Sequence, residues 1–379
     1  MLLNFGAKNF YCFREGIDVS LELSANCPRD ISQGSNVSKL LGIKGANGSG
    51  KTNLLKILAF LKDFCENSWN EKPDKEILYS GFFYNTEPTE LYCEFISNNI
   101  QYRYEVILSH KKVISEKIYR KIKKYSKVVE RNNDSITKCA NDFLDINEIK
   151  LRSNASIIST ANQYEIKNIS PIYNFFTGIY SNVRFDGRSD FSPDTNTLCK
   201  YYKEVPDVFN AAVDILKKAD LGIVDVKILS REDENKDTIY YPIFYHDTPL
   251  ETNALAFFSQ SSGTKTLFRI IPYYYMVLRF GGVLLMDEFD NDLHPHILPK
   301  IINLFLDEKT NPHNAQLIFS THNTEIMDFL GKYRTFIVNK ENSESYGYRL
   351  DEIKGDLLRN DRPISSLYER GKIGGVPSI

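Results

Sequence analysis

The segment GANGSGKT at residues 45–52 matches the pattern of a phosphate-binding loop throughout. Glycines let backbone N–H groups turn toward phosphate oxygens, and the helix N-terminus that follows adds a partial positive charge. Lys51 is expected to reach the β- and γ-phosphates of a nucleotide, and Thr52 to place its hydroxyl on Mg²⁺. The predicted nucleotide-binding residues of the loop are Asn47, Gly48, Ser49, Gly50, Lys51 and Thr52.

The alternative is a glycine-rich turn that precedes a lysine by chance. A short apolar strand at 40–44 comes before the loop, and a helix follows to about residue 62. Because a phosphate loop requires that strand and that helix, the local context favours the functional interpretation.

Two adjacent acids, Asp287 and Glu288, follow the apolar run at 283–286. A carboxylate at the end of a buried strand is costly unless it pairs or meets a metal. We therefore expect Asp287 to order Mg²⁺ and its waters, and Glu288 to act as the general base on the attacking water. The alternative, a strand running into an acidic loop, is weakened by the phosphate loop upstream.

A second polar cluster, at 320–323, closes the apolar strand 316–319. Ligands of open α/β sheets bind at the carboxyl ends of the strands. His322 could contact the γ-phosphate or hold the attacking water. Thr321 or Asn323 could instead cap the next helix, and both roles can hold at once.

Residues 259–266, SQSSGTKT, stand at the start of another predicted helix. Small hydroxyl residues and one glycine at a helix N-terminus form an anion cradle. Since one nucleotide needs only one phosphate loop, a second cradle suggests a sandwich dimer that closes on ATP held by the other subunit. The alternative is an ordinary helix start capped by Ser262.

The elements that position these motifs can be read from periodicity. The opening residues 1–24 predict a strand pair at a sheet edge, and 80–121 predict an antiparallel meander with a turn at 97–99. Residues 155–160 predict a buried strand. Residues 164–220 read as mostly helical, and 223–258 as three short strands.

From residue 262 the pattern alternates between helix and strand, as in parallel sheets with crossover helices. The helices are predicted at 264–279, 295–306 and 323–330, and the strands at 283–287, 315–320 and 334–339.

Composition limits the class of protein. The chain has 379 residues, 42% hydrophobic and 25% charged, which excludes a disordered chain. The six cysteines form no CxxC pair and no metal-ligand spacing with the six histidines, so reduced thiols are expected. Polar residues at Asn4 and Lys8 argue against a signal peptide, and no apolar run approaches a membrane span. We expect a cytoplasmic protein without membrane contact.

The formal net charge of -2 conceals a basic segment at 101–131 with ten Lys or Arg and three acids. Tyr102, Tyr104, Tyr119 and Tyr125 interleave with these charges. Basic grooves attract phosphate backbones and aromatic rings stack on bases, so the segment could bind nucleic acid or dock an acidic protein. It could equally be a solvated hairpin whose lysines protect a sheet edge.

Four motifs stand in order: GANGSGKT (45–52), SSGTK (261–265), LLMDEFDNDLHP (284–295) and STHN (320–323). Together they resemble the ABC-type ATPase heads of the SMC, Rad50 and OLD group. More closely, the chain is similar to the AAA15 and AAA21 ATP-binding proteins of prokaryotic anti-phage, or abortive-infection, defence. The opening FGAKNFYCF (5–13) and the segment LYERGKIGGVP (367–377) also resemble that group.

The resemblance implies an α/β fold of the P-loop ABC-ATPase head type, a mixed sheet with an antiparallel β subdomain and an inserted helical lobe. The expected parts are 1–163 and 259–379 for the head and 164–258 for the lobe. It implies ATP and Mg²⁺ as cofactors and a dimer, or a higher even oligomer, closed around ATP.

The resemblance also implies residue roles. Ser262 and Gly263 resemble the signature that acts in trans, His322 the switch histidine, and residues 290–295 the D-loop at the dimer interface. Gln163 is the candidate for the glutamine that contacts nucleotide and metal, because it follows the predicted strand at 155–160.

The expected function is an ATP-hydrolysing switch that controls a separately encoded effector, most plausibly a nuclease, in anti-phage defence. The alternative is a DNA-repair or recombination ATPase acting directly on nucleic acid. The chain has no long coiled coil, unlike SMC and Rad50, and no acid-rich domain after 320–323 that an OLD-type nuclease would need. It is therefore not expected to cleave nucleic acid itself.

Overall fold

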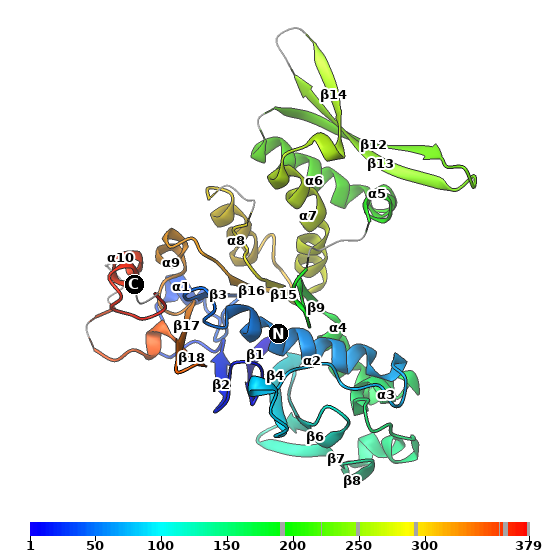
Figure 1. The fold of residues 1–379 in the computed structure, drawn as a ribbon, viewed down its shortest axis with the longest axis vertical. Helices are drawn as coiled ribbons and strands as arrows, with labels where there is room; N and C mark the ends of the chain where they lie inside the picture. Colours follow the sequence, from blue (N-terminus) through cyan, green and yellow to red (C-terminus); the bar gives the residue numbers. More distant parts are fainter. Residues whose placement is uncertain are drawn as a thin grey trace.

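The computed structural model describes residues 1–189, 194–220, 222–247, 251–291, 295–355, 357–358 and 363–376. Figure 1 shows two sheets around helix α2 in the body of the molecule and a lobe that projects from it. Among the described residues, no helix is both long enough and apolar enough to cross a bilayer.

A six-stranded sheet in the order β18-β17-β3-β16-β15-β9 forms the centre of the head. All its neighbouring pairs are parallel except β17 with β18. The three central strands β3, β16 and β15 are buried along their whole length, which explains their continuous apolar runs. The strands are β3 Leu40–Lys44, β9 Ile179–Ser181, β15 Val283–Met286, β16 Gln316–Ser320, β17 Thr335–Glu341 and β18 Glu344–Arg349.

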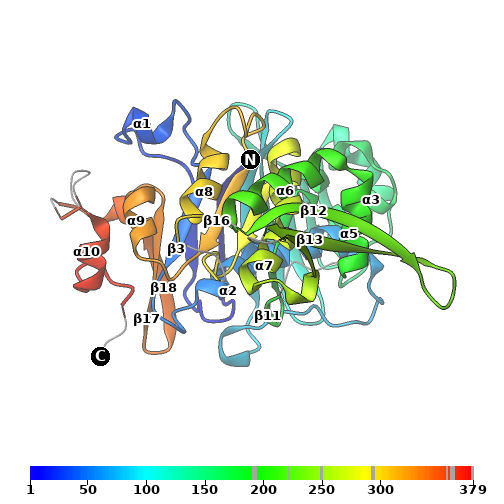
Figure 2. The same ribbon diagram turned by 90° about the horizontal axis from the view of Figure 1, so that it is seen from above.

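Helices connect and cover this sheet, as the alternating pattern predicts. The helix–strand alternation after residue 262 is confirmed, with boundaries moved by about one to three residues. Figure 2 shows α9 and α10 beside β17 and β18 at one end of the molecule and α3 at the other. The helices described in the head are α1 Arg29–Ser32, α2 Lys51–Asn67, α3 Ile157–Gln163, α4 Ser170–Thr177, α7 Ser262–Phe280, α8 Leu298–Leu306, α9 Glu325–Leu330 and α10 Ile364–Glu369.

The second sheet is antiparallel throughout, in the order β2-β1-β4-β5-β6-β7-β8. The predicted strand pair at 1–24 and the predicted meander are therefore both confirmed. Asn98 and Asn99 have positive φ values of 48° and 61°, as the tight turn between β4 and β5 requires. The strands are β1 Leu2–Lys8, β2 Ile17–Ser20, β4 Thr89–Ser97, β5 Ile100–Leu108, β6 Val113–Lys121, β7 Tyr125–Asn132 and β8 Ser135–Cys139.

The strand predicted at 155–160 is wrong, because this segment begins helix α3, Ile157–Gln163. The Ser156 hydroxyl accepts the Ser159 N–H at 2.9 Å, and the Glu116 carboxylate accepts the Ile157 N–H at 2.9 and 3.0 Å. Both interactions satisfy N–H groups that a helix start leaves free. The Glu116 contact comes from strand β6, so it is invisible to local periodicity.

The lobe contains helices α5 Thr195–Glu204 and α6 Pro206–Ala219 and a three-stranded antiparallel sheet. Its strands are β12 Ile223–Glu232, β13 Thr238–Asp247 and β14 Thr252–Ala256, which confirms the three strands predicted for 223–258. Figure 1 shows the sheet projecting from the end of the lobe, with α7 joining the lobe to the head.

The predicted lobe boundary at residue 164 needs correction. Helix α4, Ser170–Thr177, packs on α2, and β9 pairs with β15 in the head sheet. The insertion therefore starts after β9, with a small hairpin of β10 Val183–Arg184 and β11 Gly187–Arg188. Short 3₁₀ turns complete the described chain at Ser68–Asn70, Phe82–Tyr84, Asn141–Glu148, Lys167–Ile169, Phe257–Ser259 and Leu350–Glu352.

Candidate active site

A cavity of about 460 Å³ lies where β3 runs into α2 and where β15 and β16 end. Parallel strands bring their carboxyl ends to one edge of a sheet, which is where α/β proteins bind ligands. The cavity is lined by Asn47, Gly48, Lys51, Thr52, Asp287, Glu288 and His322. Seven residues predicted separately from three motifs thus line one site.

The phosphate loop is shaped to receive an anion. Gly48 and Gly50 have φ values of 74° and 112°, which residues with a Cβ rarely adopt. The Lys51 ammonium donates to the carbonyls of Gly45 at 2.9 Å and Ala46 at 3.1 Å. Burial lowers the pKa of Lys51, and the nearby carboxylates of Asp287 and Glu288 oppose that shift.

Ser49 supplies an independent sign that the loop fits a phosphate. Its hydroxyl oxygen is buried and has no hydrogen-bond partner among the described residues. A buried hydroxyl without a partner is costly, and a phosphate oxygen would satisfy it. The residues present therefore fit a nucleotide phosphate.

Thr52, Asp287 and Ser320 form the candidate Mg²⁺ position. The Thr52 hydroxyl donates to one Asp287 carboxylate oxygen at 2.6 Å, and the Ser320 hydroxyl donates to the other at 2.5 Å. In the described residues, no three His, Cys, Asp or Glu side chains gather around a metal position. One carboxylate and one hydroxyl suit Mg²⁺, which keeps several waters and takes its other ligands from phosphates.

Glu288 lies beside Asp287 at the mouth of the cavity. Its carboxylate forms an ion pair with Arg188 of the β10–β11 hairpin, and 43% of the side chain is exposed. Its φ of 51° is in the left-handed region, which bulky residues seldom occupy. The Ser320 hydroxyl accepts the Glu288 N–H at 2.8 Å and so holds this turn.

Asp290 fixes the loop that carries His322. Its carboxylate accepts the N–H groups of His322 at 3.1 Å and Asn323 at 3.0 Å. The N-cap of α9 is Thr324, without a side-chain cap bond, and the Asn323 side chain just before it accepts the Glu325 N–H at 2.9 Å. The phosphate-contacting role of His322 stays a prediction. In the predicted D-loop 290–295, residues 292–294 lie outside the described residues.

Lys44, which the sequence interpretation missed, joins the phosphate loop to the His322 loop. Its buried ammonium donates to the His322 carbonyl. Burial lowers the pKa of Lys44 to about 8, while Asp290 opposes the shift and Lys51 adds to it. The ammonium also lies 5.3 Å from the ring centroid of Tyr368 in α10.

The segment after α10 forms part of the wall behind the loop. The Tyr368 hydroxyl donates to the Gly375 carbonyl at 2.6 Å, and the Gly375 N–H donates to Asn339 at 2.6 Å. A Cβ on Gly375 would stand 3.5 Å from the Gly45 Cα. This contact gives residues 367–376 a position beside the nucleotide site.

Gln163 does not reach the site. It ends α3, and α3 is bonded to the far end of α2 through Ser159, which accepts the Trp69 N–H at 3.1 Å. The phosphate loop lies at the other end of α2, a helix of 17 residues and so about 24 Å long. The assignment of Gln163 depended on a strand at 155–160, and that strand is a helix.

Asn182 occupies the position at the end of edge strand β9. Its side-chain amide donates to the Asp287 carbonyl at 3.0 Å and accepts the Asp287 N–H at 2.7 Å. At 5% exposure, Asn182 is a buried clamp on the peptide that carries the candidate metal-binding carboxylate. A polar residue directly after the short run 179–181 was the available sequence signal.

Ser262 and Gly263 stand at the start of α7 and do not line the cavity. Ser262 is exposed, and the Ser261 hydroxyl accepts the Thr264 N–H at 3.1 Å. Ser261, rather than Ser262, therefore caps the helix. In a single copy of the chain Ser262 is exposed and Gly263 is partly exposed.

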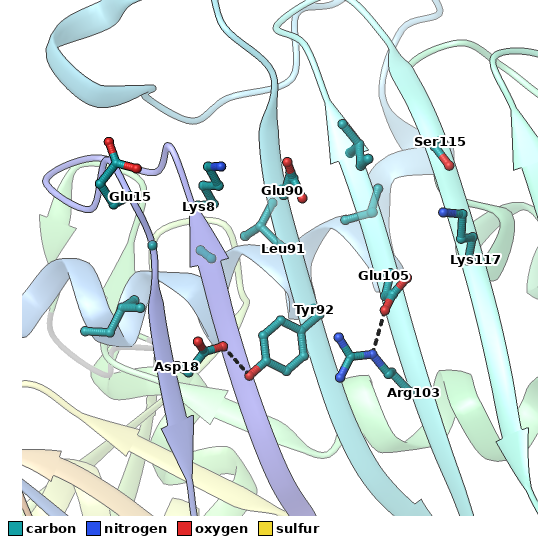
Figure 3. Close-up of a pocket in the computed structure, with 15 residues that line it drawn as sticks. Lys8, Glu15, Asp18, Glu90, Leu91, Tyr92, Arg103, Glu105, Ser115 and Lys117 are labelled. Atoms are coloured by element: carbon teal, nitrogen blue, oxygen red, sulfur yellow. Dashed lines mark hydrogen bonds and ion pairs between the residues drawn. The ribbon is translucent and has the colours of Figure 1, made fainter. Parts of the chain in front are cut away.

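The basic segment 101–131 forms strands β5 to β7, and many of its charges are paired within the sheet. Arg103 contacts Glu94 and Glu105, both at 2.6 Å, beside a cavity of about 340 Å³ that Figure 3 shows. Tyr104 is fully buried and Tyr102 is 3% exposed. Stacking on bases by these two rings is therefore excluded, and the charges free for nucleic acid are mainly lysines at 111–112 and 121–124.

A family comparison agrees with this geometry. A family model described as "AAA domain, putative AbiEii toxin, Type IV TA system" matches residues 40–328. Among solved structures, the SMC head domain from Thermotoga maritima is similar with a TM-score of 0.44 and 14% identity, covering 93% of this chain and 99% of that chain. No curated protein matches the chain.

A second solved structure is the Smc head domain with an extended coiled coil bound to the C-terminal domain of ScpA from Pyrococcus furiosus. It has a TM-score of 0.45 and 11% identity, and covers 93% of this chain and 97% of that chain. The family match extends over more than half of the sequence and includes the phosphate loop, Asp287, Glu288 and His322. The chain therefore belongs to the AAA-domain family of P-loop ATPases that is described as "AAA domain, putative AbiEii toxin, Type IV TA system".

Proposed function

We propose that this chain is an ATP-hydrolysing switch that dimerises head to head around ATP and controls a separately encoded effector of the nuclease class in anti-phage defence. The main support is the single cavity that unites Lys51, Thr52, Asp287 and Glu288. These are the residue types that position a phosphoryl group, its metal and the attacking water.

In this mechanism Lys51 leaves the Gly45 and Ala46 carbonyls to bind the β- and γ-phosphates. Thr52 and Asp287 would hold Mg²⁺, and the ion would supply positive charge to the phosphate oxygens. Glu288 accepts the proton of the attacking water, and His322 contacts the γ-phosphate from the end of β16. Glu288→Gln is expected to lower kcat at least about 10²-fold, whereas the exposed Glu325→Gln is expected to leave it unchanged.

Turnover is measured as phosphate release at saturating ATP. Lys51→Ala should lose nucleotide binding, and Glu288→Gln should retain it. Wild-type turnover by Glu288→Gln would contradict the assignment of the base.

Dimerisation is supported by the exposed start of α7. Ser262 and Gly263 have no ligand role in their own subunit, and the partial positive charge of a 19-residue helix begins there. We expect Glu288→Gln to form a stable dimer with ATP, as measured by light scattering after gel filtration. Ser262→Arg should prevent that dimer without weakening ATP binding, whereas Ser135→Arg on the exposed strand β8 should not.

The effector role is tested in cells. Expressed with its neighbouring genes, the wild type should reduce phage plaques, and Lys51→Ala or Glu288→Gln should lose that protection. The purified chain should not cleave plasmid DNA in Mg²⁺ or Mn²⁺. Cleavage that Glu288→Gln retains would overturn the separate-effector proposal.

The alternative, a repair-type ATPase acting on nucleic acid, has less support. Arg103 and Arg131 are paired with acids, and Tyr102 and Tyr104 are buried, so the basic segment offers its lysines but neither these arginines nor these two rings to a nucleic acid. ATPase rates with and without DNA at two salt concentrations distinguish the proposals, because phosphate contacts weaken steeply with salt. A salt-sensitive stimulation by DNA would favour the alternative.

A further inference from the structure

The Glu288 carboxylate forms an ion pair with Arg188, a residue that stands outside the sequence motifs of the site. Arg188 Nη1 donates to Glu288 Oε2. One of the two carboxylate oxygens therefore accepts from a guanidinium. The ion pair also fixes the rotation of the carboxylate.

The two residues come from parts of the chain that serve different functions. Glu288 follows β15 in the head, whereas Arg188 ends the β10–β11 hairpin that leads into the lobe. Glu288 lines the nucleotide cavity and also a small neighbouring cavity of about 40 Å³. Arg188 lines the neighbouring cavity and not the nucleotide cavity. The ion pair therefore holds the Glu288 carboxylate between the two cavities.

The hairpin is itself anchored to the nucleotide side of the head. The Tyr11 hydroxyl donates to the Phe185 carbonyl at 3.2 Å, and Asn182, directly before the hairpin, clamps the Asp287 peptide. Helix α2 also packs against both strands of the hairpin. Arg188 is therefore held by elements of the head that surround the nucleotide site.

Proton transfer to Glu288 would neutralise the carboxylate and leave the Arg188 cation without its partner. The ion pair thus opposes the step that the proposed function assigns to Glu288. We infer that Arg188 is a positioning residue that restrains Glu288 and keeps ATP turnover low until the pair opens. This inference rests on the proposed function, because it takes Glu288 as the base.

The strength of the restraint follows from exposure. The side chains of Arg188 and Glu288 are 27% and 43% exposed, so water screens their attraction. Removing a pair of this kind should raise kcat by about two- to fivefold. A restraint of that size can be released by nucleotide binding or by closure of a second subunit.

The test compares Arg188→Gln with Arg184→Gln, a matched change at an exposed position of the same hairpin. Arg188→Gln should raise kcat about two- to fivefold with unchanged ATP affinity and unchanged melting temperature. Arg184→Gln should behave as wild type. Arg188→Lys keeps the charge but loses the planar guanidinium, so its kcat should lie between those of the wild type and Arg188→Gln.

The double variant Arg188→Gln/Glu288→Gln separates this inference from the proposed function. If Arg188 acts through Glu288, the double variant is as inactive as Glu288→Gln. Activation that persists in the Glu288→Gln background, unchanged kcat in Arg188→Gln, or a lower kcat with intact ATP affinity would each overturn the restraint. Full turnover by Glu288→Gln alone would instead refute the proposed base.

Discussion

Asn182→Leu is the sharpest single test of how the site is assembled. The substitution keeps the side-chain size and removes both hydrogen bonds to the Asp287 peptide, at 3.0 and 2.7 Å. Both peptide groups are then left buried without the amide, and each such loss costs about 1–3 kcal/mol. We expect the free energy of unfolding to fall by about 2–5 kcal/mol.

The functional effect should exceed what the lost stability explains. Without its clamp, the Asp287 carboxylate is free to move relative to Thr52, and a misplacement of about 1 Å costs about 10²-fold in rate. ATP affinity should change little because the phosphate loop is untouched. A raised KM for ATP with an unchanged kcat would contradict this expectation.

Urea unfolding followed by circular dichroism gives the stability, and phosphate release gives kcat, both below the unfolding transition. Asn210→Leu, an exposed position on α6, is the matched control. If Asn182→Leu lost less than about 0.5 kcal/mol, the two hydrogen bonds would not be the clamp described here.

Three further predictions concern the walls of the site and its support. Gly45→Ala should weaken ATP binding at least about tenfold by calorimetry, because its Cβ would lie 2.4 Å from the Val338 carbonyl oxygen. Arg131→Met should cost about 3–5 kcal/mol of unfolding free energy, since it leaves the fully buried Glu116 without its cation; adding Glu116→Gln should recover part of that loss. Lys44, whose pKa is lowered from 10.5 to about 8, should lose its proton as pH rises through about 8. We expect kcat/KM to decline at that pH in the wild type and to stay constant in Lys44→Arg. The unfolded chain keeps this proton up to about pH 10.5. Lys44 alone therefore makes the unfolding free energy rise between about pH 8 and pH 10.5. A wild-type kcat/KM that stays constant as pH rises through this range would contradict the Lys44 assignment.

The parts of the site that sequence predicts are those encoded by contiguous residues. The phosphate loop, the acids after β15 and the polar cluster after β16 each combine an apolar strand with a turn a few residues away. Parallel pairing then brings these turns to one edge, which the alternation after residue 262 already indicates. Local chemistry and sheet topology were sufficient for them.

The errors arise where distant segments decide the outcome. Ile157 starts a helix because Glu116 of another strand accepts its N–H, and no local pattern carries that information. Arg103 and Arg131 look available in sequence, yet cross-strand register places acids beside both. Asn182 gains its role from the Asp287 backbone that it faces, and Arg188 gains its role from the Glu288 side chain.

The contact between Gly375 and Gly45 has a consequence for the order of biosynthesis. The phosphate loop is translated early, whereas the segment that packs behind it follows roughly 330 residues later, which at usual elongation rates is tens of seconds. For most of that interval the His322 carbonyl that accepts from the Lys44 ammonium has not been made, and Tyr368 follows later still. A nascent chain should therefore acquire its complete nucleotide site only late in synthesis, so that an ATPase made in part remains inactive.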